Sequence, residues 1–174
     1  MSGSLRLLAV RLSATALFLL SSACSSPDAT KVSQIAVPDR AEFKTSVSPF
    51  LEKRCAALDC HGQVGRPLLL YSQFGLRMTT GPNNTRDTSP TTDAERTANY
   101  FATIGLEPED ISDSLLSRGA FSDFLLLKKP LGIEGGGVRH KGGPVLRTAD
   151  TGYDCLASWV AGQLNAGSCA DAAK

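Results

Sequence analysis

Two cysteines followed at once by a histidine constrain this chain more than any other feature. The stretch reads Cys55-Ala56-Ala57-Leu58-Asp59-Cys60-His61-Gly62. In such a pattern, each thiol bonds to a vinyl group at the edge of a haem porphyrin, and the imidazole binds the iron as the proximal axial ligand. Haem attachment usually places two residues between the cysteines, whereas this chain has four, so the extra pair must bulge outward. The sequence therefore predicts a covalent haem c held by Cys55, Cys60 and His61.

Three other interpretations of this motif stay open. In the first, Cys55 and Cys60 form a disulfide and His61 has no special role, although so short a loop would stabilise the fold little. In the second, the three residues bind zinc with one further ligand, although adjacent ligands rarely point at one tetrahedral centre. In the third, the cysteines are a thioredoxin-type redox pair, which would need two intervening residues and a βαβ setting.

A six-coordinate haem iron needs a second axial ligand. His140, the only other histidine, lies in the glycine-rich stretch 132–143, where small residues let the backbone pass close to a flat ring. Met78 competes with it, because methionine is also an axial ligand of cytochromes c. We expect His140, with Met78 as the alternative, and an open or water-bound sixth position also remains possible.

The N-terminus has the form of a bacterial lipoprotein signal. Positive charges precede the short apolar run Leu12–Leu20, and small residues then lead to Cys24. The run is too short for a membrane span and is typical of a secretory signal peptide. We expect cleavage after residue 23 and lipidation of Cys24, with plain secretion as the alternative. The residue after this cysteine is Ser25 rather than Asp, which favours the outer membrane, facing the periplasm.

Composition limits the partners and the redox state. The net charge is +1 and no basic stripe is present, so nucleic acid is not an expected partner. Export places the cysteines in an oxidising compartment, where we expect Cys155 and Cys169 to form a structural disulfide. Aromatic residues make up only 6 % of the chain, and a porphyrin would add a large apolar body for the core to pack against.

Periodicity predicts a mainly α fold with long loops. The expected helices cover 41–54, which Pro49 either kinks or divides, then 93–104, 108–118 and 151–164, the last ended by Gly167. Thr92 and Glu95 form a capping box, and the helix they begin is expected to bury Ala94, Ala98, Phe101 and Ala102. Segment 66–78 is compatible with a short helix or an extended chain, and 79–92 is expected to be an exposed loop. The expected organisation is a signal peptide at 1–23, a flexible tether at 24–39, one domain at 40–169 and a tail at 170–174.

Several further segments resemble a known family. They are Val47-Ser48-Pro49-Phe50-Leu51 before the cysteines, the later run 122–126 with Lys129-Pro130, His140 with Gly142-Gly143, and the closing segment 153–162 around Trp159. Together with Cys-His-Gly, they resemble the planctomycete-type c-like cytochrome domain over roughly residues 42–162. The resemblance implies a small cytochrome c-like helical domain around one covalent haem c, with His61 proximal and His140 distal.

The sequence thus predicts a lipid-anchored, mono-haem c-type cytochrome that transfers single electrons to a redox partner protein and is attached to the membrane through Cys24. No motif indicates a substrate pocket, so an electron carrier is expected rather than an enzyme with its own substrate. The alternative is a structural or binding lipoprotein, stapled by two disulfides and without a cofactor.

Overall fold

The structure is a computed structural model that describes residues 35–78 and 88–174, which form one compact unit. These residues are mainly helical, as predicted, and the described part of the chain has no β-strand beyond an isolated bridge between Tyr71 and Leu76. The predicted signal peptide, the lipidation site Cys24 and most of the tether lie outside the described residues. Most of the predicted loop 79–92 does so too.

The first helical stretch is continuous from Arg40 to Arg54 but changes its winding near Pro49. It comprises α2 (Arg40–Glu42), a π-helical turn η2 (Phe43–Val47) and α3 (Ser48–Arg54). Pro49 lies in the first turn of α3, a position at which its fixed φ suits a helix. The preceding π turn takes up the change in the hydrogen-bond ladder. The predicted buried face is confirmed for Phe43, Val47, Phe50 and Leu51.

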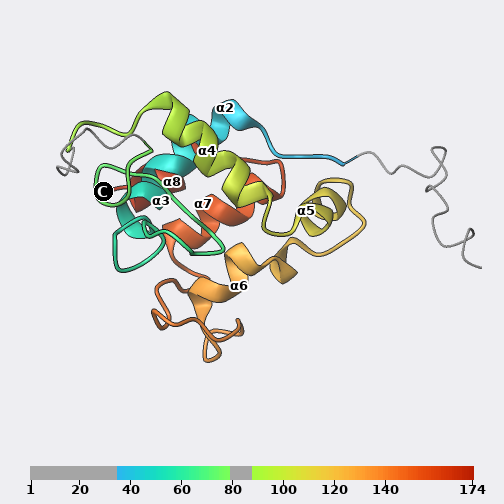
Figure 1. Cartoon of the computed structure of the whole chain (residues 1–174). Helices are drawn as coiled ribbons and strands as arrows, with labels where there is room; N and C mark the ends of the chain where they lie inside the picture. The colour runs from blue at the N-terminus through green and yellow to red at the C-terminus, as the bar shows by residue number, and fades with distance from the viewer. Residues whose placement is uncertain (1–34, 79–87) are drawn as a thin grey trace, which may run out of the picture. The chain divides into compact units, whose positions relative to one another are not determined.

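Helix α7 (Thr151–Val160) contacts most of the other helical elements, and Figure 1 shows it running through the middle of the described unit. Trp159 on this helix is fully buried, with its ring centroid 5.0 Å from that of Phe43. Its indole nitrogen donates to the Asp39 carbonyl at 3.2 Å. Tyr100 packs edge-on against the same Phe43 ring at 5.6 Å. These aromatic contacts join η2, α4 and α7 in one core.

Helix α4 (Asp93–Ile104) begins and ends where the sequence predicted, and its Thr92–Glu95 capping box is present. The predicted buried face is wrong for Ala94 and Phe101, which are exposed, whereas Ala102 is partly buried and packs against the core. Phe101 is 55 % exposed, and the buried side is made of Glu95, Asn99, Tyr100 and Thr103. Polar side chains can be buried on this face because groups of the loop that follows the cysteine motif form hydrogen bonds with them. The Asn99 side chain accepts from the Tyr71 amide at 2.7 Å and donates to the Tyr71 carbonyl at 2.8 Å.

The middle of the chain forms short helices. They are α5 (Pro108–Leu115), which is shorter than predicted, the 3₁₀ turn η3 (Phe121–Asp123) and α6 (Leu125–Leu131). Leu127 and Leu131 of α6 are buried, and Pro130 lies in its last turn. Gly132 ends α6 with φ +65°, a conformation that favours glycine.

The C-terminal part differs from the prediction. Helix α7 stops at Val160 rather than residue 164, because Gly162 turns the chain with φ +70°. Gly167 does not end a helix but lies inside α8 (Ala166–Ala172), which Asn165 caps through Ser168. The segment predicted as a tail, 170–174, is therefore mostly helix. The predicted disulfide is present and joins Cys155 of α7 to Cys169 of α8.

Candidate functional site

The cysteine motif forms a tight turn at the end of α3. Cys55 is the C-cap residue that directly follows α3, and its amide donates to the Leu51 carbonyl at 2.9 Å. The Cys55 carbonyl in turn accepts from the His61 amide at 3.0 Å. The Cys60 amide donates to Ala57 at 3.0 Å, which closes the four intervening residues into a compact bulge. The longer spacing is thus absorbed locally, and Cys60 and His61 return to the helix end.

Two glycines let the chain fold back on this turn. A Cβ atom at either Gly62 or Gly75 would collide with the Ala56 carbonyl. The Ser72 hydroxyl donates to that same carbonyl at 3.1 Å. The Leu76 amide donates to the Gly62 carbonyl at 3.1 Å. The loop that follows the motif is therefore folded directly onto it, which fixes the backbone of His61.

His61 is held in one tautomer. Its Nδ1 lies 2.9 Å from the Leu68 carbonyl, which can only accept, so Nδ1 carries the proton and Nε2 presents a lone pair. Partial burial lowers the pKa of His61, and the charges of His140, Arg66 and Lys129 lower it further. The ring is therefore neutral at pH 7, the state in which imidazole binds metals.

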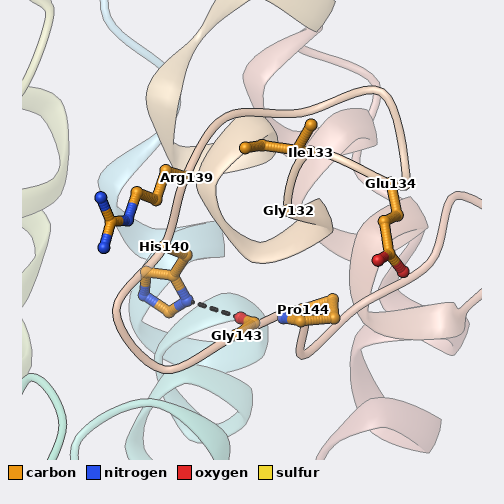
Figure 2. A pocket seen from close by; sticks show the side chains of 7 residues that line it. All are labelled: Gly132, Ile133, Glu134, Arg139, His140, Gly143 and Pro144. Atoms are coloured by element: carbon orange, nitrogen blue, oxygen red, sulfur yellow. Dashed lines mark hydrogen bonds between the residues drawn. The ribbon is translucent and has the colours of Figure 1, made fainter.

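The imidazole of His140 is held by the same kind of hydrogen bond as that of His61. It lies in the loop after α6, and its Nδ1 is 2.9 Å from the Gly143 carbonyl, as Figure 2 shows. Gly143 has φ +73°, which turns this carbonyl back toward the ring. His140 also presents Nε2 as its free nitrogen.

The structure brings these two imidazoles together from segments 79 positions apart in the sequence. Their ring centroids are 6.0 Å apart and their planes differ by 10°. A single metal ion between two imidazoles requires roughly 6 Å between centroids, since each metal–nitrogen bond is about 2 Å and each ring adds its half-width. Carbonyl acceptors on the second nitrogen are also typical of metal-binding histidines. The separation of the two rings therefore matches what two imidazoles on one metal ion would need.

The two motif cysteines are free thiols, so the Cys55–Cys60 disulfide considered above is not formed. Burial, with a smaller contribution from Cys60, raises the pKa of the Cys55 thiol to about 12. The pKa of the more exposed Cys60 thiol is also raised, by partial loss of solvent contact and by the neighbouring Asp59. Reactive redox cysteines have lowered pKa values, so this environment does not favour thiol–disulfide chemistry.

Met78, the alternative axial ligand, is 43 % exposed. Its backbone amide donates to Glu95 of α4 at 2.9 Å. The ring of His61 lies next to that of His140.

Apolar side chains remain exposed on both histidine-bearing segments. They are Leu58, Val64, Phe74 and Met78 on 55–78, and Ile133 and Val145 on 132–145. An apolar cofactor such as a porphyrin would cover side chains of this kind. The hollow beside His140 in Figure 2 has a volume of about 180 Å³. It is smaller than ordinary small-molecule sites and forms no substrate pocket by itself.

Sequence reasoning missed two polar features of this region. Glu95 and Arg77 form a buried ion pair that fastens the end of the loop to α4. The capping-box pattern at Thr92 was the signal for Glu95, but nothing in the sequence marked Arg77 as its partner. Arg66, close to His61 and Cys60, also gave no signal.

Within the described ranges, no cluster of three or more His, Cys, Asp or Glu side chains is arranged to hold a metal ion. None of the helices described is long and apolar enough to cross a membrane. Comparison of the chain with protein-family models, with curated proteins and with solved structures gives no match.

Proposed function

We propose that the chain is a lipid-anchored, periplasm-facing, mono-haem c-type cytochrome that transfers single electrons. The observation that carries the proposal is the parallel pair of imidazoles, His61 and His140, each with Nδ1 on a backbone carbonyl and Nε2 free. Cys55 and Cys60 are thiols beside this pair and would form the covalent links. A bound haem would supply a one-electron Fe(III)/Fe(II) couple.

The two histidines would influence the reduction potential of a bound haem. Two imidazole ligands hold the potential lower than an imidazole and a methionine sulfur do. The carbonyls of Leu68 and Gly143 accept from the two Nδ1–H groups, which makes both rings more basic and keeps them oriented. A site of fixed ligands needs little rearrangement when the charge changes, as suits electron transfer better than catalysis on a substrate.

The test compares axial-ligand variants of the exported protein by optical and electron paramagnetic resonance spectroscopy. His140→Ala should keep covalent haem but lose the low-spin signature, because one strong ligand is removed. Met78→Ala is the matched control and should keep a wild-type spectrum. A low-spin spectrum that survives His140→Ala would remove His140 as the ligand.

His61→Ala tests the other side of the site and should abolish the low-spin spectrum. If the wild-type protein contains no haem and Cys55 is bonded to Cys60, the cytochrome proposal is wrong. The disulfide-stapled structural or binding lipoprotein then replaces it.

A further inference from the structure

Four large apolar side chains are exposed outside the two histidine-bearing segments. They are Ile35, Val37, Phe101 and Leu116, with exposed fractions from 44 to 60 %. The other large apolar side chains exposed in the described ranges belong to 55–78 and 132–145. Single exposed apolar side chains are common on proteins, whereas gathered ones mark a contact surface. Whether these four form such a surface depends on how close together they lie.

Two of the four belong to segment 35–39, the extended stretch that leads into α2. In an extended chain, successive side chains point to opposite sides. Pro38 is buried and Ala36 is partly buried, whereas Ile35 and Val37 are exposed. Ile35 and Val37 therefore share the outer side of the segment.

Two hydrogen bonds hold segment 35–39 against the helices that carry the other two side chains. The Ala36 amide donates to the hydroxyl of Ser112 in α5 at 3.0 Å. The hydroxyl of Tyr100 in α4 donates to the Pro38 carbonyl at 2.9 Å. Figure 1 shows the segment, in blue, running from α2 toward α5. It is thus fixed to both α4 and α5.

Phe101 and Leu116 are neighbours of these two contact residues. Phe101 follows Tyr100, and their ring centroids are 5.3 Å apart. Leu116 lies one helical turn after Ser112, and its amide donates to the Ser112 carbonyl at 3.0 Å. The four exposed side chains are therefore grouped around segment 35–39, and we call them the apolar patch.

We propose that the apolar patch rests on the lipid bilayer that holds Cys24. The inference rests on the lipid anchor of the proposed function. Eleven positions separate Cys24 from Ile35, and a chain of that length spans at most about 40 Å. The patch thus stays near the bilayer surface at a high effective concentration. Four apolar side chains then suffice for a contact that they would not sustain from free solution.

The charges near the apolar patch favour a neutral lipid surface. Glu109 and Asp110 of α5 are exposed, while Asp39 and Arg40 beside the segment offset each other. Exposed basic side chains gather instead on 128–147 and are Lys129, Arg139, Lys141 and Arg147. Anionic headgroups attract basic side chains and repel carboxylates. The partner that fits the patch is therefore zwitterionic lipid.

This contact would also orient the candidate haem site. Figure 1 shows 132–147, in orange, on the side of the described unit opposite to segment 35–39. With the apolar patch on the bilayer, the loop that carries His140 faces the aqueous space. A redox partner protein would reach the site from there.

The test uses the full-length lipidated protein in phosphatidylcholine nanodiscs that contain a lipid with a gadolinium chelate on its headgroup. Gadolinium broadens the NMR signals of nearby amides, and the protein is kept reduced so that a bound iron adds no broadening. We expect the amides of Val37, Phe101 and Leu116 to lose most of their intensity, while those of 132–145 keep theirs. Equal loss in both regions would overturn the inference.

Phe101→Ser should restore the signals of Val37 and Leu116, because it removes the largest side chain of the apolar patch. Phe101→Leu is the matched control, since it stays apolar and should keep the signal loss of the wild type. Val37→Ser serves the same purpose if Phe101→Ser does not fold. Serine variants that behave like the wild type would overturn the inference.

Lipid composition gives a second readout on the same nanodiscs. Replacing part of the phosphatidylcholine by anionic phosphatidylglycerol should weaken the signal loss at the apolar patch. A loss that moves to 128–147 would show that the basic loop faces the bilayer and would overturn the inference. Patch amides that shift with protein concentration before lipid is added would show that a second copy covers the patch, with the same consequence.

Mass spectrometry of the same protein separates this inference from the proposed function. If Cys24 carries no lipid, the anchor of the proposed function is wrong and the inference falls with it. If Cys24 is lipidated and the patch amides keep their signals, the inference alone is wrong. The haem spectrum of the sample tests the cytochrome proposal independently of both.

Discussion

The ion pair between Glu95 and Arg77 makes part of the stability depend on pH, and Glu95→Gln tests its strength. The Glu95 side chain is 2 % exposed and accepts from Arg77 twice, at 2.8 and 3.0 Å. It also accepts from the backbone amides of Thr92, at 2.8 Å, and Met78, at 2.9 Å. One carboxylate thus joins the start of α4 to the end of the loop that carries His61.

The magnitude follows from the pKa of Glu95. Burial alone would raise this pKa, but the hydrogen bonds from Arg77, Thr92 and Met78 outweigh burial and lower it from 4.5 to about 2. The folded-state pKa is below the unfolded one, so the stabilisation is full above about pH 4.5 and disappears as the pH falls toward about 2. Linkage gives about 3 kcal/mol at pH 6, of which about 2 kcal/mol is lost by pH 3.

The assay is urea unfolding of the wild type and of Glu95→Gln at pH 6 and pH 3. At pH 6 the variant should lose about 3–5 kcal/mol, because Arg77 stays buried without its charge partner. At pH 3 the difference between the two proteins should be smaller by about 2 kcal/mol. Asp113→Asn, which removes the exposed pair with Arg118, is the control and should change stability by less than about 1 kcal/mol. A difference between wild type and Glu95→Gln that is the same at both pH values would refute the reasoning.

Three further predictions concern the Cys155–Cys169 disulfide, the turn that contains the cysteine motif, and the expected lipid attachment at Cys24. Replacing Cys155 and Cys169 together by serine should lower the free energy of unfolding by about 3 kcal/mol, because the disulfide closes a loop between positions 14 apart. Urea unfolding measures this, and an unchanged midpoint would contradict the prediction. Gly75→Ala should destabilise the fold by about 1–3 kcal/mol, because the added Cβ would collide with the Ala56 carbonyl. In Gly119→Ala, the control, the added Cβ has room, so its thermal unfolding should be close to that of the wild type. Equal effects of the two substitutions would argue against the close approach at Gly75. Cys24→Ser should move the protein from the membrane to the soluble fraction, and retention on the membrane would exclude lipidation as the anchor.

The parts of the fold that the sequence predicted correctly depend on local patterns. The 93–104 helix was bounded correctly because Thr92 and Glu95 form a cap between neighbours in the chain. The first buried face was correct because Phe43, Val47 and Phe50 have apolar helical spacing without competing partners.

The parts predicted wrongly depend on partners far away in the sequence. Asn99 is buried on α4 instead of Phe101 because it bonds to Tyr71, 28 positions away, and no local pattern shows this. Helix α8 was missed because its sequence is short and rich in small residues, and its packing depends on the disulfide to Cys155.

The candidate site divides in the same way. Cys55, Cys60 and His61 are adjacent in the sequence and define the motif by themselves. The sequence favoured His140 over Met78 because of its glycine-rich surroundings, and the structure adds that its ring lies 6.0 Å from that of His61. Arg66 could not be predicted, because an unpaired buried nitrogen becomes visible only when the loop is folded.

The central claim is that Cys55, Cys60 and the two histidines hold one covalent haem. The most direct measurement is the absorption spectrum, reduced and in pyridine, of protein exported by a host with haem c maturation machinery. The account predicts one haem per chain, with an α band at the position for two saturated vinyl groups. A band shifted toward one saturated vinyl would mean that one of the two cysteines is not attached, and the absence of haem absorbance would contradict the account.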